Sequence, residues 1–250
     1  MSDKEKYSFS YSIESKFEPA ISRHFFKLRM LPWECSFQHV VEKRLVITPD
    51  CVMTEATDGF GNKVQYGGFS MPHSRFCVES SGIVECSEYR IPGKPEDIYL
   101  AATPLTEWND EIMLLGANGE AADIMHRVHR HLTYERFVTD NTTSAIEAFR
   151  IGKGVCQDFA HLMIAVCRSQ GLHARYVNGL TLGEGETHAW VEVNDGMQWL
   201  GYDPTLDRVI THSYIKFAHG RDVADCPSNR GRFYGWTSEV MSIHCRMHEI

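Results

Sequence analysis

Residues 187–203 read THAWVEVNDGMQWLGYD, two strand-like runs on either side of Asp195-Gly196. An Asp-Gly pair between two such runs is among the strongest short-range signals for a β-hairpin. With a two-residue loop at this pair, the residue directly opposite His188 is Asp203. Opposed side chains lie on one face with Cβ atoms about 4.5–5.5 Å apart, close enough for the carboxylate to accept an imidazole N–H. A register shifted by one residue would place them on opposite faces.

Cys156 is the second residue of interest. It follows Gly152–Val155 and opens a predicted helix that extends to about Gln170. A thiol at a helix N-terminus meets free backbone N–H groups and the positive end of the helix dipole, which favour the thiolate form. Asp158 is expected to cap the start of the helix. The alternative is a buried structural cysteine, the commoner environment of this residue. The apolar stripe of the predicted helix is Phe159, Leu162, Met163 and Val166.

A cysteine, a histidine and an aspartate in this order suit acyl transfer. Cys156 would be the nucleophile, His188 would hold and transfer the proton, and Asp203 would orient the imidazole. A solvent-facing histidine beside a chance aspartate is the alternative. The backbone N–H of Cys156 is a natural oxyanion donor. Candidate side-chain donors are Tyr134, Gln157 and Trp190, although such aromatic residues more often serve packing.

Four blocks in this order resemble the bacterial transglutaminase-like superfamily, whose members are often described as cysteine proteases. They are Gly154–His161, Ala174–Val177, His188–Glu192 and Tyr202–Thr205, with further similarity at Gly220–Asp222 and in the Asp58–Asn62 turn. The resemblance implies a papain-like α+β core, with Cys156 as nucleophile, His188 as base and Asp203 as orienting acid. It implies nothing for Gly235–Ile250, where the match is weak.

Composition excludes several classes of protein. Hydrophobic residues make up 43% and charged residues 23% of 250, the balance of a folded globular chain rather than a disordered one. No stretch approaches the roughly 20 apolar residues of a membrane span. The first thirty residues build no apolar signal core, so a cytoplasmic location is expected. With a net charge of −8 and no long basic run, neither nucleic acid nor a membrane surface is an expected partner.

The sequence pattern changes near residue 90, from strand-like runs to a mixture of helical and strand-like segments. Before it, short runs rich in β-branched and aromatic residues predict a small antiparallel β domain over 1–90. The runs are Tyr7–Ile13, His24–Met30, Phe37–Thr48, Lys63–Phe69 and Arg75–Cys86. After a linker at Pro92–Asp97, residues 91–250 predict an α+β catalytic core. Its other predicted helices are Glu120–Leu132 and Ala145–Arg150, and its predicted strands are Ala174–Leu180, Thr187–Val193 and Gln198–Tyr202.

No metal and no organic cofactor are expected, since the proposed chemistry needs neither. The eight cysteines include no Cys-x-x-Cys pair and are interpreted as free thiols. His126, His129 and His131 favour a solvated helix face over a metal site, because no carboxylate or cysteine stands at ligand spacing. The segment His244–His248 favours a final strand or a loose tail.

The predicted function is thiol-dependent acyl chemistry on an amide, with hydrolysis of a peptide or isopeptide bond as the first choice. The expected substrate is therefore a peptide or protein amide. The first alternative is transglutamination, in which an amine intercepts the same acyl-enzyme. The second is a catalytically inactive binding or scaffold module. The oligomeric state is left open.

Overall fold

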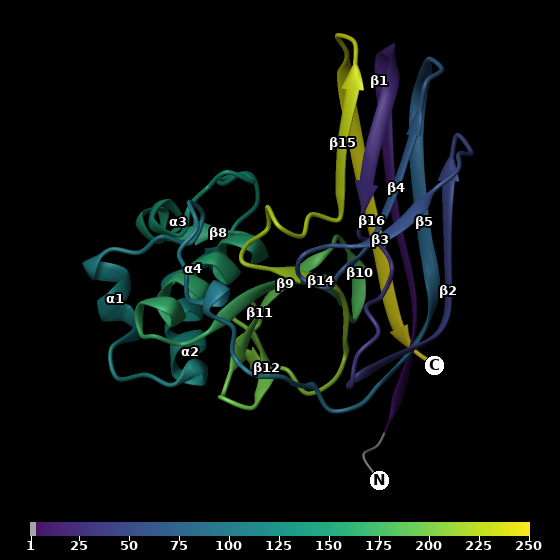
Figure 1. Ribbon diagram of the computed structural model, residues 1–250. Helices are drawn as coiled ribbons and strands as arrows, with labels where there is room; N and C mark the ends of the chain where they lie inside the picture. The colour runs from purple at the N-terminus through teal and green to yellow at the C-terminus, as the bar shows by residue number, and fades with distance from the viewer. Residues whose placement is uncertain (1–3) are drawn as a thin grey trace.

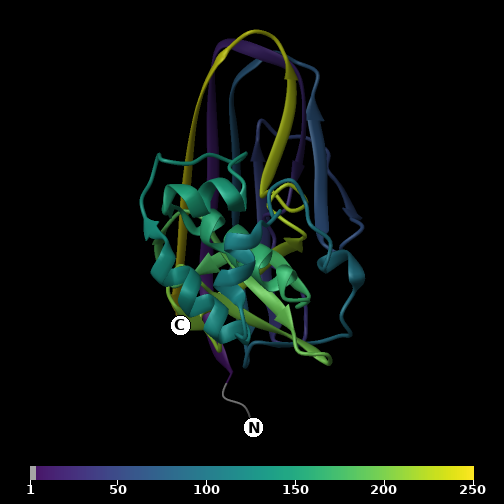
Figure 2. The same cartoon turned by 90° about the vertical axis from the view of Figure 1, so that its left-hand side faces the viewer.

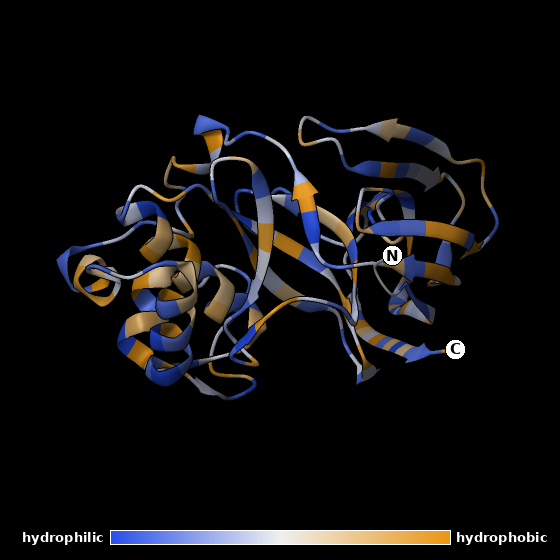
Figure 3. Cartoon of the chain, turned by 90° about the horizontal axis from the view of Figure 1, so that it is seen from below, coloured by the Kyte–Doolittle hydropathy of each residue, from blue (hydrophilic) through white to orange (hydrophobic). Residues whose placement is uncertain are grey.

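The structure, a computed structural model, describes residues 4–250. A tall group of antiparallel strands, a smaller central sheet and a group of helices stand side by side in Figure 1. Figure 2 turns the helical side toward the viewer, and Figure 3 shows the same parts from below. The predicted α+β class is therefore confirmed. No helix within residues 4–250 is long and apolar enough to cross a membrane.

The longest strand, β1 (Glu5–Leu28), takes part in two sheets. Its first half pairs with β5 (His73–Cys86) on one side and with β16 (Ser238–Glu249) on the other. Its second half pairs with β4 (Lys63–Phe69) and β15 (Asn229–Tyr234). The outer strands are β2 (Gln38–Thr48), which pairs with β5, and β3 (Thr54–Thr57), which pairs with β4.

The prediction of separate strands at Tyr7–Ile13 and His24–Met30 was wrong, because both runs contribute to β1. The register shifts between Lys16 and Ile21, so an irregularity rather than a loop separates the two halves. Sequence patterns do not distinguish a strand that bends at an irregularity from two strands that are joined by a loop. The other three predicted runs of this region correspond to β2, β4 and β5.

The last strands of the chain return to the first. Both β15 and β16 pair with β1, so residues 229–249 complete the sheets formed by the N-terminal region. The alternatives left open for His244–His248 resolve to a strand, β16. The division into 1–90 and 91–250 stays a prediction about domains, but the hydrogen-bonded sheets do not follow it at the C-terminus.

The central sheet is antiparallel and carries the candidate residues. In spatial order it contains β13 (Arg208–Val209), β12 (Gln198–Asp203), β11 (His188–Asn194), β9 (Ala174–Thr181) and β14 (Tyr214–Gly220), with β6 (Arg90–Pro92) on β12. The short strands are β7 (Thr133–Tyr134), β8 (Lys153–Gly154) and β10 (Gly183–Gly185). The helices are η1 (Asp97–Tyr99), α1 (Asp110–Gly116), α2 (Ala121–His131), α3 (Ala145–Ile151) and α4 (Cys156–Ser169).

Helix α4 lies at the centre of the helical side. It packs on β9 and β11, and α1, α2 and α3 pack around it. Its predicted apolar stripe is buried, with Leu162 and Met163 fully inaccessible to solvent. Burial of one such side chain stabilises the fold by about 1.5–3 kcal/mol. Helix α1 was not predicted, although the Asn109 side chain caps it by accepting the Ile112 N–H at 3.0 Å.

A buried charge cluster lies within the central sheet and includes Tyr89, the residue before β6. Glu192 is fully buried on β11 and binds Arg175 at 2.5 Å and Lys216 at 2.7 Å. The hydroxyl of Tyr89 donates to the same carboxylate at 2.5 Å. Buried ions require such pairing, since an unpaired charge in the interior is strongly destabilising.

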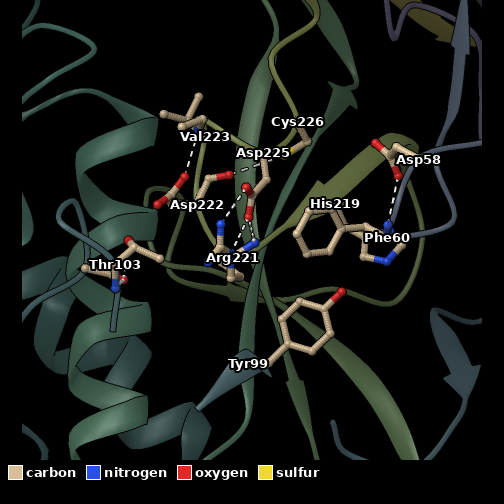
Figure 4. A network of polar contacts seen from close by, with 12 residues as sticks. Asp58, Phe60, Tyr99, Thr103, His219, Arg221, Asp222, Val223, Asp225 and Cys226 are labelled. Carbon is tan, nitrogen blue, oxygen red and sulfur yellow. Dashed lines mark hydrogen bonds and ion pairs between the residues drawn. The ribbon is translucent and has the colours of Figure 1, made fainter. Parts of the chain in front are cut away.

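The predicted turn at Asp58–Asn62 links the N-terminal region to the central sheet, and part of this link is visible in Figure 4. Asp58 accepts the backbone N–H groups of Phe60 and Asn62, both at 3.0 Å. The Asn62 amide in turn donates to the His219 carbonyl at 2.8 Å and accepts the His219 N–H at 2.9 Å. The turn thereby fixes β14 against the N-terminal region.

Candidate active site

Local backbone geometry places Cys156 at the first position of α4. Helix α3 ends at Gly152, whose φ of 70° is left-handed and favours glycine. Asp158 caps α4 as expected, because its Oδ2 accepts the Val155 N–H at 2.7 Å. A Cβ on Gly154 would lie 2.5 Å from that oxygen, so only glycine leaves room for the cap. The Cys156 N–H therefore belongs to the first helical turn, where N–H groups have no partner within the helix.

His188 and Asp203 lie close together at neighbouring strand ends. The Nε2 atom of His188 is 2.6 Å from Oδ2 of Asp203. The Asp203 side chain is fully buried, and that of His188 is 13% exposed. Their pairing brings the end of β12 to the start of β11.

The predicted register of this hairpin was wrong by two residues. The loop contains four residues, Asp195 to Gln198, and Asn194 pairs with Trp199. His188 is therefore a diagonal rather than a direct neighbour of Asp203. A two-residue shift preserves the face of every side chain, and diagonal positions are within reach of long side chains.

The Asp203 carboxylate receives three donors besides His188. The Tyr214 hydroxyl donates to Oδ2 at 2.6 Å, and the backbone N–H groups of Thr205 and Leu206 donate to Oδ1 at 2.9 and 3.0 Å. Burial by itself raises the pKa of Asp203, but the His188 and Tyr214 hydrogen bonds hold it below its usual value. The group is thus kept as a carboxylate in a dry environment.

The Cys156 thiol also raises the pKa of His188. Burial alone would lower the pKa of His188, but hydrogen bonds to Asp203 and Cys156 and the charges of both groups raise it to about 10. Because Nε2 faces Asp203, the other ring nitrogen, Nδ1, is left for the thiol. The imidazole therefore stands between a carboxylate and a sulfur, the arrangement needed to move a proton at the sulfur.

Cys156 and His188 share a cavity of about 770 Å³. Tyr134 and Gln157, two of the candidate donors, line it too. Burial and the neighbouring Cys156 raise the pKa of the Tyr134 hydroxyl. The opposite wall comes from the N- and C-terminal strands through Tyr11, Ile13, Met241, Ile243 and Cys245.

The third candidate donor, Trp190, requires a correction. Its indole Nε1–H donates to the Tyr89 hydroxyl at 2.9 Å, and the ring is fully buried outside the cavity lining. It stacks beside His188 with ring centroids 6.4 Å apart. Trp190 therefore supports the imidazole and has no free donor for an oxyanion. Strand alternation predicted which face of the strand carries Trp190, but it could not predict that Tyr89 accepts the indole N–H.

Two parts of the chain match known protein families. Residues 108–204 match the family described as "Transglutaminase-like superfamily", and residues 7–85 match "Bacterial transglutaminase-like N-terminal region". The chain belongs to the transglutaminase-like superfamily. It is 27% identical to an uncharacterized protein of Mycobacterium tuberculosis, with 94% of this chain and 89% of that protein covered. A Mycobacterium leprae relative is 29% identical over 88% of this chain and 90% of its own length.

The fold of this transglutaminase-like protein has a solved counterpart. A crystal structure titled a "Putative Cysteine Protease" from Cytophaga hutchinsonii superposes with a TM-score of 0.83. The alignment covers 100% of this chain and 92% of that one at 22% identity. The likeness shows that the two chains share a fold.

The histidine run of this transglutaminase-like protein is divided among separate partners. His126 binds Asp207 at 2.5 Å, His129 binds the Pro204 carbonyl at 3.1 Å and His131 binds the Phe149 carbonyl at 2.8 Å. Across residues 4–250, no group of three or more His, Cys, Asp or Glu side chains is arranged to hold a metal ion.

Sequence reasoning missed two parts of the site. Tyr214 lies on β14, and its bond to Asp203 depends on the packing of a strand that is not adjacent to β12. The β16 wall of the cavity comes from the segment with the weakest sequence match. Neither feature has a local pattern, because both arise where distant strands meet.

Proposed function

We propose that this protein catalyses acyl transfer from an amide through Cys156, with water as the acceptor and a peptide or isopeptide bond as the substrate. The observation that carries the proposal is the position of His188, between the Asp203 carboxylate and the Cys156 thiol at the wall of a large cavity. Membership of the transglutaminase-like superfamily supports the same chemistry.

In the proposed reaction, the Cys156 thiol passes its proton to His188 and the sulfur attacks the substrate carbonyl carbon. The Cys156 N–H donates to the developing oxyanion. His188 gives a proton to the leaving amine, the C–N bond breaks and a thioester remains. Water then attacks the thioester while His188 accepts its proton, which releases a carboxylic acid and restores the thiol. Asp203 keeps the imidazole oriented and stabilises its positive charge.

Transglutamination is the second candidate, favoured by the family to which the chain belongs. The first half of the reaction is identical, and an amine replaces water in the second half. Exclusion of water and admission of an amine decide between the two outcomes. A substrate screen run with and without added lysine separates them, because only transamidation yields an amide with the added amine.

The first experiment measures the alkylation rate of each cysteine against pH by peptide mass spectrometry. We expect Cys156 to react fastest below pH 7 and to slow in His188→Ala. Cys51, which is also half-buried and lies outside the cavity, is the internal reference. Equal rates at both cysteines would contradict the proposal and favour the scaffold module.

Turnover supplies the second test. We expect Cys156→Ala to abolish it and to leave the circular dichroism spectrum unchanged, whereas Cys51→Ala keeps full activity. Activity that survives Cys156→Ala would exclude this residue as the nucleophile.

A further inference from the structure

One edge of strand β16 is open beside the candidate active site. Along its other edge, β16 pairs with β1 from Ser238 to Glu249. On the open side, β10 pairs only with Cys245 to Met247. No other strand in the part of the chain that the structure describes pairs with Ser238–His244 on that side. These seven residues offer an edge roughly 24 Å long.

The open segment also faces the cavity. Met241 and Ile243 line it together with Cys156 and His188. Ile243 pairs with Ile13 of β1, and cross-strand partners project to the same face, which explains why both side chains line the same wall. The edge and the thiol therefore border one continuous space.

This edge lacks the usual protection against pairing. Proteins commonly cover an edge or place lysine, proline or a bulge on it. Ser238–His244 contains none of the three and has one charged side chain, Glu239. Val240 and Met241 are 69% and 53% exposed. Three residues of the same chain, β10, already add as a strand further along, which demonstrates that the edge accepts a partner.

We propose that Ser238–His244 is the docking site for an extended polypeptide substrate, which adds to β16 as a strand in line with β10. Only a polypeptide backbone presents N–H and C=O groups at the spacing that this edge requires. Alternate side chains of the bound segment enter the cavity, and one amide lies at Cys156. The inference rests on the proposed function for the identity of that amide, but docking itself is measurable without turnover.

The test measures binding of a fluorescein-labelled decapeptide, rich in threonine and valine with a central glutamine, to the Cys156→Ala protein by fluorescence anisotropy. Two further peptides carry N-methyl groups on alternate amides. One is methylated at the odd-numbered positions and the other at the even-numbered positions, and these two patterns are the two methylation frames. An added strand has one set of amides facing β16 and the other facing away. We expect methylation in one frame to weaken binding at least about tenfold, because two or three hydrogen bonds are lost. The other frame retains affinity.

Proline substitutions locate the edge on the protein. Adjacent N–H groups of β16 point to opposite edges, so one of Met241→Pro and Ser242→Pro removes a donor from the open edge and the other disrupts pairing with β1. We expect one variant to keep the wild-type melting temperature and lose peptide affinity about tenfold. The other variant loses thermal stability.

Several results would overturn the docking site: no binding, equal weakening in both methylation frames, or undiminished affinity in both proline variants. A dimer that persists at saturating peptide and dissociates in the stable proline variant would assign the edge to a second copy instead. Because Cys156→Ala cannot react, these outcomes are independent of the proposed chemistry. Failure of the proposed function appears separately, as an unreactive Cys156 in the alkylation experiment.

Discussion

Replacement of Asp203 by asparagine tests the electrostatic core of the site. The pKa of His188 is raised from 6.5 to about 10 although burial opposes the rise. At about 1.4 kcal/mol per pH unit, this corresponds to on the order of 5 kcal/mol of stabilisation of the imidazolium. Asp203 and Cys156 both contribute to it. A Cys156→Ala background removes the sulfur and isolates the part due to Asp203.

In Cys156→Ala we expect His188 to titrate above 6.5, because the Asp203 carboxylate still faces it at 2.6 Å. In Cys156→Ala/Asp203→Asn we expect it to titrate below 6.5, because burial then acts without an opposing anion. The expected fall is at least about 2 pH units, or roughly 3 kcal/mol. Asparagine has nearly the same shape as aspartate and still offers an oxygen to Tyr214.

The assay is an NMR titration of the histidine ring protons, with the His188 signal identified by its absence in His188→Gln. Asp207→Asn is the matched control, because Asp207 forms the exposed ion pair with His126. The control removes a carboxylate that does not face His188 and should leave the titration of His188 unchanged. If His188 titrates at the same pH with and without the Asp203 charge, the electrostatic argument is refuted.

Three further predictions concern stability. Tyr214→Phe removes a buried donor from the Asp203 carboxylate and should lower the free energy of unfolding by about 1.5–3 kcal/mol, measured by urea denaturation; a change below 0.5 kcal/mol would contradict this. Glu192→Gln leaves Lys216 buried without its anion and should cost about 3–5 kcal/mol in the same assay; a loss below about 1 kcal/mol would contradict the buried pairing. Because the pKa of folded His188 exceeds that of the unfolded chain, its contribution to stability is complete below pH 6.5 and is lost as pH rises toward 10. Wild type should therefore lose stability relative to His188→Gln between pH 7 and 10. If the free energies of unfolding of the two proteins change in parallel with pH, this prediction is wrong.

The candidate residues themselves were accessible to sequence reasoning. Cys156 was identified by the glycines before it and the apolar period after it, which are local signals of a helix start. His188 and Asp203 were identified by strand alternation and a turn signal. That prediction survived a two-residue error in register because side chains in a strand alternate with a period of two. The α+β class and the β-rich N-terminal region followed from the same periodicities.

By itself, the sequence determined helices α2 to α4, strands β2, β4, β5, β9, β11 and β12, and which of their residues share a face, since these depend on neighbours a few positions apart. Only the tertiary structure decided what surrounds them. It brought Tyr214 to Asp203, directed the Trp190 N–H to Tyr89 and returned β16 to form the wall opposite Cys156. These contacts join positions far apart in the chain, and no local pattern encodes them, because they form where separate sheets pack and pair.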